Sequence, residues 1–375
     1  MTGLALYLST CFGLPHYMML LSLIPAVYFR KEEIAHYIIQ IKSGQIIFSR
    51  AIWIITGIAL FTFSNALFHG HFSSLSYPIL LLLTAFIAGA FRPEDLRIIS
   101  WMAAIEAIVC IVEISLKIPS IFPWIETKTA AIDSGLLYQN RVYGLSDESS
   151  NAAQKMMFGL FALSIAPFQI KKIASLIPGV LILMGILITF NRTVMLVSVL
   201  YLVLNFISLA TVRPINREQV KMLLYIIIGA FGLVLALVLK GGSEVMAQFT
   251  RGTGILDMAG RSDIWTYCLD FIVSHPILGN GSEKWYFGAY HAHNSYLQIA
   301  ASHGIIVLFG FIVVVFWGIN RNNIIRVICI LLYSVFQYGF GWGISLLDIF
   351  FLAMLTKKDL FRNLRTGIEP SFVKN

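Results

Sequence analysis

Long apolar runs recur from one end of the chain to the other, and they constrain the fold more than any other feature. Hydrophobic residues make up 58% of the 375 residues and charged residues only 12%, whereas soluble domains carry about 25% charged residues. The runs are continuously apolar, unlike the alternating strands of a transmembrane barrel. The sequence therefore predicts an all-α polytopic membrane protein in which residues 1–375 form a single transmembrane domain.

About 20 apolar residues are enough for a helix to cross a bilayer. The first apolar segment, Leu4 to Phe29, lacks a basic n-region and a small-residue cleavage site, so we expect it to be retained rather than cleaved as a signal peptide. Ten further spans are predicted at 52–68, 76–91, 99–116, 152–168, 173–190, 193–210, 222–239, 304–320, 324–339 and 341–356. The total is about eleven transmembrane helices if the first segment is one long helix or a shorter helix with an interfacial lead. It is twelve if the first segment is a hairpin or if one of the predicted spans contains two.

The positive charges predict the orientation of these spans. If the loop 30–50 lies in the cytoplasm, only nine of the 27 lysines and arginines fall outside or at outer helix ends: Lys117, Lys128, Arg141, Lys155, Arg192, Lys240, Arg251, Arg261 and Lys284. Cytoplasmic loops of membrane proteins are enriched in positive charge, so the net charge of +8 requires no nucleic-acid partner. Two sizeable outer loops result, at 117–151 and 240–303. The outer face has no ATP, so a reaction there would need an activated donor.

Three of the outer arginines lie next to predicted span ends or helices. Arg141 lies at the end of the first outer loop. Arg192 lies where one span turns almost directly into the next, and Arg261 begins a helical pattern. Guanidinium groups match the oxygens of phosphates, so arginines on one face predict a site for a diphosphate. The alternative is that each arginine reaches to lipid head groups.

The stretch from Arg261 to Gly304 is the longest run of mixed polarity. Apolar residues recur at helical spacing from Ile264 to Val273, and a Pro276-containing turn ends the pattern. A second polar motif, His291-Ala292-His293-Asn294, precedes the next apolar run. A histidine here could act as a general base, with Asn294 orienting it or capping the next helix.

Other roles are open for several of these residues. The histidines could instead lie at the membrane interface, and their spacing to His303 and Glu283 matches no familiar metal site. Glu106 and Glu113 share one face of a span, where they could form a proton path or pair inside the bundle. Five tryptophans near predicted interfaces suggest an aromatic belt: Trp101, Trp124, Trp265, Trp285 and Trp342.

Taken together, these motifs resemble the signature region of the O-antigen ligase and O-antigen polymerase superfamily of bacterial inner-membrane glycosyltransferases. The resemblance covers roughly residues 130–320 and rests on four segments: Arg141 to Leu145 with Asn151, Asn191 to Thr193, Arg261 to Trp265 with Pro276 to Gly281, and His291 to Leu297 with Gly304. It implies a GT-C-like fold of membrane helices, with short helices in the large periplasmic loop.

The resemblance also implies the chemistry. The donor would be an oligosaccharide on undecaprenyl diphosphate at the periplasmic face of the inner membrane, and no cofactor or metal would be needed. Arg192 and Arg261, with Arg141 as a less clear third cation, would bind the diphosphate. His293 would be the base that accepts the proton of the acceptor hydroxyl, with Asn294 beside it and His291 as its rival. A single displacement would invert the anomeric centre.

The acceptor remains open at this stage. A polymerase would elongate O-antigen, capsule or exopolysaccharide repeat units, with a chain-length regulator as a further partner, whereas a ligase would transfer the chain to lipid A core. We favour a polymerase. A transporter or flippase for lipid-linked sugars is a third interpretation, although the chain shows no inverted repeat and few charges within its spans.

Overall fold

The computed structural model describes residues 2–29, scattered positions between 31 and 39, and residues 47–118, 120–122, 142–163, 177–212 and 261–357. Arg141, Trp124, the predicted span 222–239, the greater part of the predicted outer loop 117–151 and residues 240–260 of the predicted outer loop 240–303 lie outside these residues. The described helices form two compact units. Unit 1 comprises residues 1–9, 16–92 and 258–375, and unit 2 comprises residues 10–15 and 93–257.

The described chain is helical and apolar, which confirms an all-α polytopic membrane protein. Three of its helical segments are long and apolar enough to cross a membrane: Ala51–Phe68, Phe72–Gly89 and Pro93–Leu116. Six shorter apolar helical segments lie at Tyr17–Tyr28, Ile177–Ile188, Arg192–Ser208, Ile305–Gly318, Ile324–Phe336 and Leu346–Thr356. These segments coincide with predicted spans and differ from them mainly at their ends.

The N-terminal segment is not one long helix. Helix α1 (Thr2–Leu8) is followed by a turn, by the 3-10 helix η1 (His16–Ser22) and by α2 (Leu23–Phe29), and both η1 and α2 contact α1. The turn contains Phe12 and Gly13, whose φ angles of 59° and 65° cannot continue a right-handed helix. Of the arrangements predicted for this segment, the structure therefore has the hairpin.

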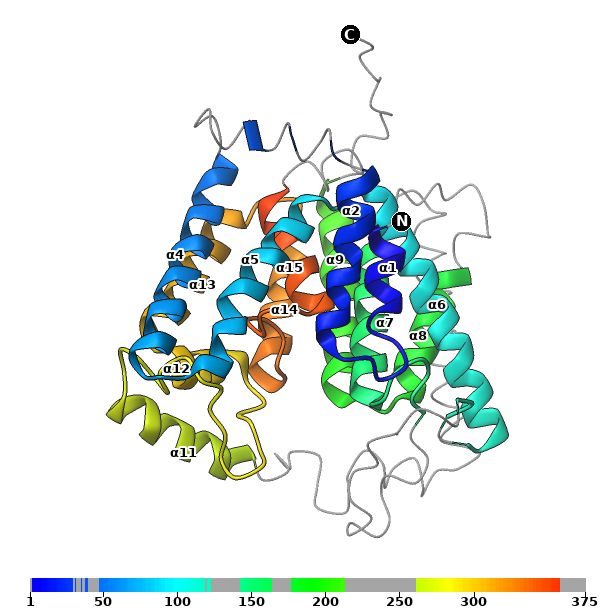
Figure 1. Ribbon diagram of the computed structural model, residues 1–375. Helices are drawn as coiled ribbons and strands as arrows, with labels where there is room; N and C mark the ends of the chain where they lie inside the picture. Colours follow the sequence, from blue (N-terminus) through cyan, green and yellow to red (C-terminus); the bar gives the residue numbers. More distant parts are fainter. Residues whose placement is uncertain are drawn as a thin grey trace. The chain divides into compact units, whose positions relative to one another are not determined.

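Unit 1 is built on helices α4 (Ile47–Phe68), α5 (Ser76–Gly89), α13 (Ile305–Gly318), α14 (Ile324–Phe336) and α15 (Leu346–Thr356). Helix α4 packs against α5 and α13, and α15 packs against α5, α13 and α14. The short helix η2 (Phe72–Leu75) joins α4 to α5. Helices α11 (Arg261–Ser274) and α12 (Ser295–His303) cover one end of this bundle, with α11 lying across it (Figure 1).

Both ends of the bundle are held by hydrogen bonds between distant segments. At the end covered by α11 and α12, which we call the capped end, the Asn65 amide of α4 donates to Leu278 O at 2.8 Å. At the opposite end, Lys357 Nζ donates to Phe91 O at 2.6 Å, and Asn323 Nδ2 donates to Met354 O at 2.8 Å. The chain segments 69–75, 275–304 and 337–345 meet at the capped end, where Glu283 lies 3.6 Å from His71 Nε2 and Gly339 N donates to Ser295 Oγ at 2.7 Å.

Unit 2 contains α6 (Pro93–Leu116), α7 (Ser149–Leu163), α8 (Ile177–Ile188) and α9 (Arg192–Val212). Helix α6 packs against both α7 and α8 through small residues. A Cβ atom at Gly159 would overlap the side chain of Ala103, and one at Gly185 would lie 2.7 Å from Ala107 Cβ. Small residues let helix backbones approach closely, which is the common way of packing helices in membranes.

Candidate active site

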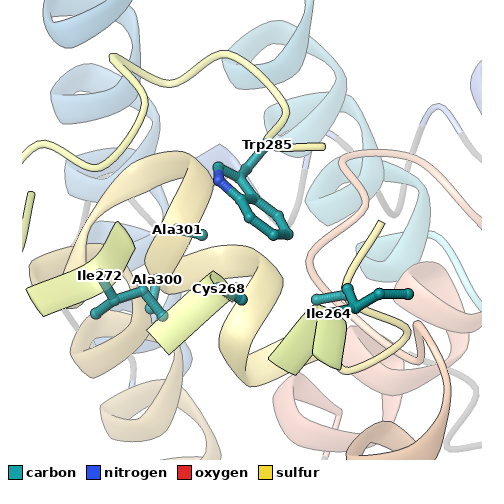
Figure 2. Close-up of a cluster of buried hydrophobic side chains, with 7 residues drawn as sticks. Ile264, Cys268, Ile272, Trp285, Ala300 and Ala301 are labelled. Atoms are coloured by element: carbon teal, nitrogen blue, oxygen red, sulfur yellow. The ribbon is translucent and has the colours of Figure 1, made fainter. Parts of the chain in front are cut away.

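The polar stretch 261–304 folds onto a small apolar core of its own. Ile264, Cys268 and Ile272 lie on one side of α11 and pack against Trp285, Ala292, Ala300 and Ala301, with α12 beside them (Figure 2). The helical pattern predicted for this stretch is confirmed, although two of its apolar members, Leu269 and Val273, are 49% and 79% exposed. Trp285 is 6% exposed and belongs to this core, so its assignment to an interfacial belt was wrong.

The turn between α11 and α12 depends on glycine. Gly279 and Gly281 in this turn have φ angles of 57° and 60°, and Gly304, which follows α12 and packs against the Ile277 carbonyl, has a φ of 90°; L-residues with a side chain rarely adopt such angles. The turn binds the end of α12 through Asn280 N to Ala301 O at 2.8 Å and Ser282 N to Ser302 O at 2.9 Å. The chain is thereby returned to the capped end just before the histidine motif.

The histidine motif is held from two sides at its central residue, Ala292. Trp265 Nε1 donates to Ala292 O at 2.6 Å, and Ala292 N donates to Gln298 Oε1 at 2.9 Å. Gln298 is fully buried, and its Nε2 donates to Trp285 O at 2.7 Å and to Ser302 Oγ at 3.1 Å. These bonds fix the backbone between the two histidines.

His293 itself has a left-handed backbone, with φ of 49°. This conformation costs roughly 1–2 kcal/mol for a residue with a Cβ, and such strain often accompanies functional sites. The next residue, Asn294, caps α12, because its Oδ1 accepts hydrogen bonds from Tyr296 N at 2.9 Å and Leu297 N at 3.1 Å. The predicted capping role of Asn294 is confirmed.

The two histidine rings lie together, with centroids 3.9 Å apart and planes inclined by 40°. The backbone N–H of His293 donates to His291 Nδ1 at 3.1 Å. A nitrogen that accepts a hydrogen bond carries the lone pair, so the proton of a neutral His291 ring lies on Nε2. The bond therefore fixes the tautomer of His291.

Two cations act on this pair. Burial, together with the charges of His293, Lys284 and Arg261, lowers the pKa of His291 from its ordinary value to about 3. Burial and the charges of Arg261 and Lys284 lower the pKa of His293 to about 4. Both rings are consequently neutral near pH 7, and a neutral imidazole can accept a proton.

Arg261 is fixed beside the histidines by the end of another helix. Its Nη1 donates to Phe336 O at 2.7 Å, where α14 ends. The position at the start of α11, predicted from the sequence, is confirmed. The bond orients the plane of a guanidinium group, whose N–H donors point in fixed directions.

The loop 337–345 contributes residues that the sequence analysis assigned to spans. The Tyr338 and Trp342 rings lie 5.9 and 6.2 Å from the His291 ring. Asp348 holds the loop by accepting from Gly341 N at 2.6 Å and Trp342 N at 3.1 Å. Ser295, at the start of α12, accepts from Gly339 N at 2.7 Å. The alternating glycines at 339, 341 and 343 were the sequence signal for a loop in this position.

The residues considered for a metal site do not join the histidine pair. His303 stacks on Tyr77 with ring centroids 4.1 Å apart, and Glu283 lies 3.6 Å from His71 Nε2. Within the described ranges, no group of three His, Cys, Asp or Glu side chains could hold a metal ion.

Comparison with known proteins identifies the family of this site. Residues 177–312 match the family model described as O-antigen ligase. This part of the chain is therefore similar to the O-antigen ligase and polymerase superfamily. The matched region runs from α8 to α13 and contains Arg192, Arg261, His291 and His293, whereas the loop 337–345 lies beyond it. No match was found among the curated proteins or among the solved structures.

Arg192 of the O-antigen ligase region lies in unit 2, in the first turn of α9. Helices α8 and α9 are separated only by residues 189–191, and Asn191 Oδ1 accepts from Val194 N at 3.1 Å as α9 begins. The tight turn predicted here is confirmed. Ser149 Oγ donates to Thr189 O at 3.1 Å and so ties this turn to the start of α7.

The two carboxylates of α6 hold the segment that follows Arg141. Glu113 accepts from Tyr143 N at 2.9 Å and Gly144 N at 2.8 Å. Glu106 accepts from Ser146 Oγ at 2.9 Å and forms a buried ion pair with Lys155, with Nζ 3.0 Å from Oε1. Pairing inside the bundle, one of the two predicted roles, therefore accounts for both carboxylates.

Proposed function

We propose that this chain transfers a glycan from undecaprenyl diphosphate to a sugar hydroxyl at the periplasmic face of the bacterial inner membrane. The similarity of residues 177–312 to the O-antigen ligase and polymerase superfamily supports a lipid-linked glycan donor and a glycan acceptor. The orientation is supported by positive charge at the end of unit 1 opposite the capped end, where Arg321, Arg326 and Lys357 lie. The capped end, which carries the histidine pair, would then face the periplasm.

The geometry of the two histidines carries this proposal, because it gives them different roles. The lone pair on Nδ1 of His291 is already engaged by the His293 backbone, so His291 acts as a hydrogen-bond donor through Nε2. His293 is the base. Its unusual backbone conformation and the bonds at Ala292 support a ring held in one position for proton transfer.

The reaction is a single displacement. The acceptor oxygen forms a bond to the anomeric carbon, the bond from that carbon to the diphosphate breaks, and the imidazole of His293 takes the hydroxyl proton. The configuration of the anomeric carbon is inverted, and the proton is later released to water. Arg261 stabilises the negative charge that develops on the leaving diphosphate. Arg192, with Arg141 as a third cation, has the same role by resemblance to the family.

Substrate binding would itself strengthen the base. In the free protein the pKa of His293 is lowered partly by Arg261 and Lys284. A bound diphosphate neutralises nearby cations, so the pKa of His293 rises when the donor is present. Proton transfer is then favoured only in the complex.

The reaction can be tested with purified protein and a lipid-linked oligosaccharide in detergent. We expect His293→Ala to abolish transfer and His275→Ala to preserve it, because His275 is an exposed histidine that directly follows α11 and lies outside the histidine motif. EDTA should leave the rate unchanged. Transfer by His293→Ala at the native rate would overturn the assignment of the base.

Between the two acceptors we propose a polymerase of O-antigen, capsule or exopolysaccharide repeat units. Its partners would include the lipid-linked repeat unit and a chain-length regulator. The family model, described as O-antigen ligase, favours lipid A core as the alternative acceptor. Deletion of the gene separates the two: single-repeat lipopolysaccharide or lost capsule indicates a polymerase, whereas long chains retained on undecaprenyl diphosphate indicate a ligase.

A further inference from the structure

Lys284 lies in an aromatic cage next to the histidine pair. Its Nζ is 3.3 Å from the centroid of the Trp342 ring, 5.1 Å from that of Tyr286 and 5.8 Å from that of Tyr338. A cation over the face of an aromatic ring is attracted by the ring electrons. The cage therefore holds the ammonium group near His291, because Tyr338 and Trp342 also contact the His291 ring.

Both sides of this cage are rigidly built. The residue after Lys284, Trp285, is anchored through its backbone, because its N–H donates to Ser302 Oγ at 3.0 Å and its carbonyl accepts from Gln298. On the opposite side, Asp348 holds the backbone of Trp342. Lysine is a flexible residue, so anchoring on both sides indicates a position that is set before any ligand binds.

The ammonium group has no anionic partner among the described residues of the chain. Among the residues that the structure describes, no oxygen accepts a hydrogen bond from Nζ and no carboxylate forms an ion pair with it. An ammonium group has three donors and is strongly hydrated in water, and the ring contacts satisfy none of those donors with an oxygen. Burial lowers the pKa of Lys284 to about 8, so the group is still largely protonated at pH 7.

Lys284 and Arg261 also belong to one electrostatic site, because each of them lowers the pKa of both His291 and His293. The site thus contains two cations and two neutral histidines. Asp348, the carboxylate of the supporting loop, is occupied by Gly341, Trp342 and Ser345. Such an arrangement is complementary to an anion that is supplied by the substrate.

We propose that Lys284 binds an anionic oxygen of the substrate beside His291 and His293. The oxygen belongs either to the diphosphate of the donor or to the carboxylate of an acidic sugar. This role rests on the proposed function, since it assigns a ligand in the same site. It adds a cation to the arginines on which the family resemblance relies.

Binding measurements on Lys284→Met and Lys284→Arg test the role. The protein would be placed in nanodiscs of neutral phosphatidylcholine, with undecaprenyl diphosphate as one probe and glucuronate as the other. We expect Lys284→Met to weaken binding of one probe by about tenfold or more, as for loss of a hydrogen bond to a charged group, and Lys284→Arg to restore it. The probe that responds identifies the source of the anion. Lys117→Met serves as the matched control and should bind as the native protein does.

The pH dependence of binding tests the same role without a substitution. Affinity for the responding probe should fall as the pH rises through about 8, where Lys284 loses its proton. The groups around Nζ are Arg261, which stays charged, the neutral histidines, and the Tyr286 and Tyr338 hydroxyls, whose pKa values burial raises. In Lys284→Arg this decrease should disappear.

Unchanged binding of both probes by Lys284→Met would overturn the inference, as would a native pH profile that is flat from 7 to 9. Glycan transfer measured in parallel keeps this result separate from the proposed function. If the protein transfers glycan but Lys284→Met leaves the binding of both probes unchanged, only the anion-binding role of Lys284 is refuted. If the protein shows no transfer activity but still binds a probe through Lys284, the proposed glycosyltransferase function is wrong and the anion-binding role of Lys284 stands.

Discussion

Gln298 connects the histidine motif, at Ala292, with the segment at Trp285. Its replacement gives a quantitative test of the structure. The side chain is fully buried and binds the backbone at Ala292 and Trp285, as well as Ser302 Oγ. In Gln298→Leu, a substitution of similar volume, the Ala292 N–H and the Trp285 carbonyl lose their partners. Each buried group left unsatisfied costs about 1–3 kcal/mol, so the free energy of unfolding should fall by roughly 2–6 kcal/mol.

The same substitution should reduce the rate of glycan transfer even where the variant is fully folded, because Ala292 lies between His291 and His293. A displacement of about 1 Å in a catalytic group can reduce the rate by about 100-fold. We would measure the midpoint of thermal unfolding and the rate of glycan transfer at a temperature where the variant is folded. Gln337→Leu provides the control, since this half-buried glutamine has no side-chain hydrogen bond within the described structure.

The expected result is a lower unfolding midpoint for Gln298→Leu than for Gln337→Leu, with transfer lost only in the first variant. If both variants unfold at the native temperature and transfer at the native rate, the bonds through Gln298 do not hold the histidine motif. The proposed positioning of His293 would then be wrong.

Four further outcomes are expected. His293→Gly and His293→Ala should both lose transfer, but the glycine variant should be about 1 kcal/mol more stable in thermal unfolding, because glycine relieves the φ of 49°. On the acid side, the kcat/KM for the free enzyme should decrease as the pH falls toward about 4, where His293 becomes protonated, rather than near 6.5. Glu106→Gln should lower the free energy of unfolding by about 3–5 kcal/mol, because it leaves Lys155 buried without its partner, and Glu106→Gln combined with Lys155→Met should recover part of that loss in the same assay. Gly304→Ala should give little folded protein on size-exclusion chromatography, because its φ is 90° and a Cβ atom would overlap the Ile277 carbonyl.

The sequence predicted the helices well, because membrane spans are encoded by local composition. Predicted spans such as 76–91 and 304–320 agree with α5 and α13 to within two residues at each end. The prediction was less accurate where packing overrides hydrophobicity. Residues 337–345 are apolar enough that the sequence assigned them to the ends of two spans. In the structure they form a loop, because Ser295 and Asp348 accept hydrogen bonds from its backbone.

The candidate site was predicted in part. The sequence placed His291, His293 and Arg261 in one polar stretch, and it indicated that Asn294 could cap a helix. It did not connect Lys284 with this site, because the partners of Lys284 come from elsewhere. Trp342 lies 58 positions further along the chain, and no periodicity or motif links the two residues.

The sequence by itself determined that this chain crosses a membrane, where its helices lie and which superfamily its histidine motif resembles. These properties depend on residues that are neighbours in the chain. Only the tertiary structure decided that His291 is held in one tautomer, that Gln298 and Trp265 position the motif, and that Lys284 lies in an aromatic cage beside it. The physical reason is that a pKa, a tautomer and an unpaired charge depend on distances between side chains, and those distances are set by how the helices pack.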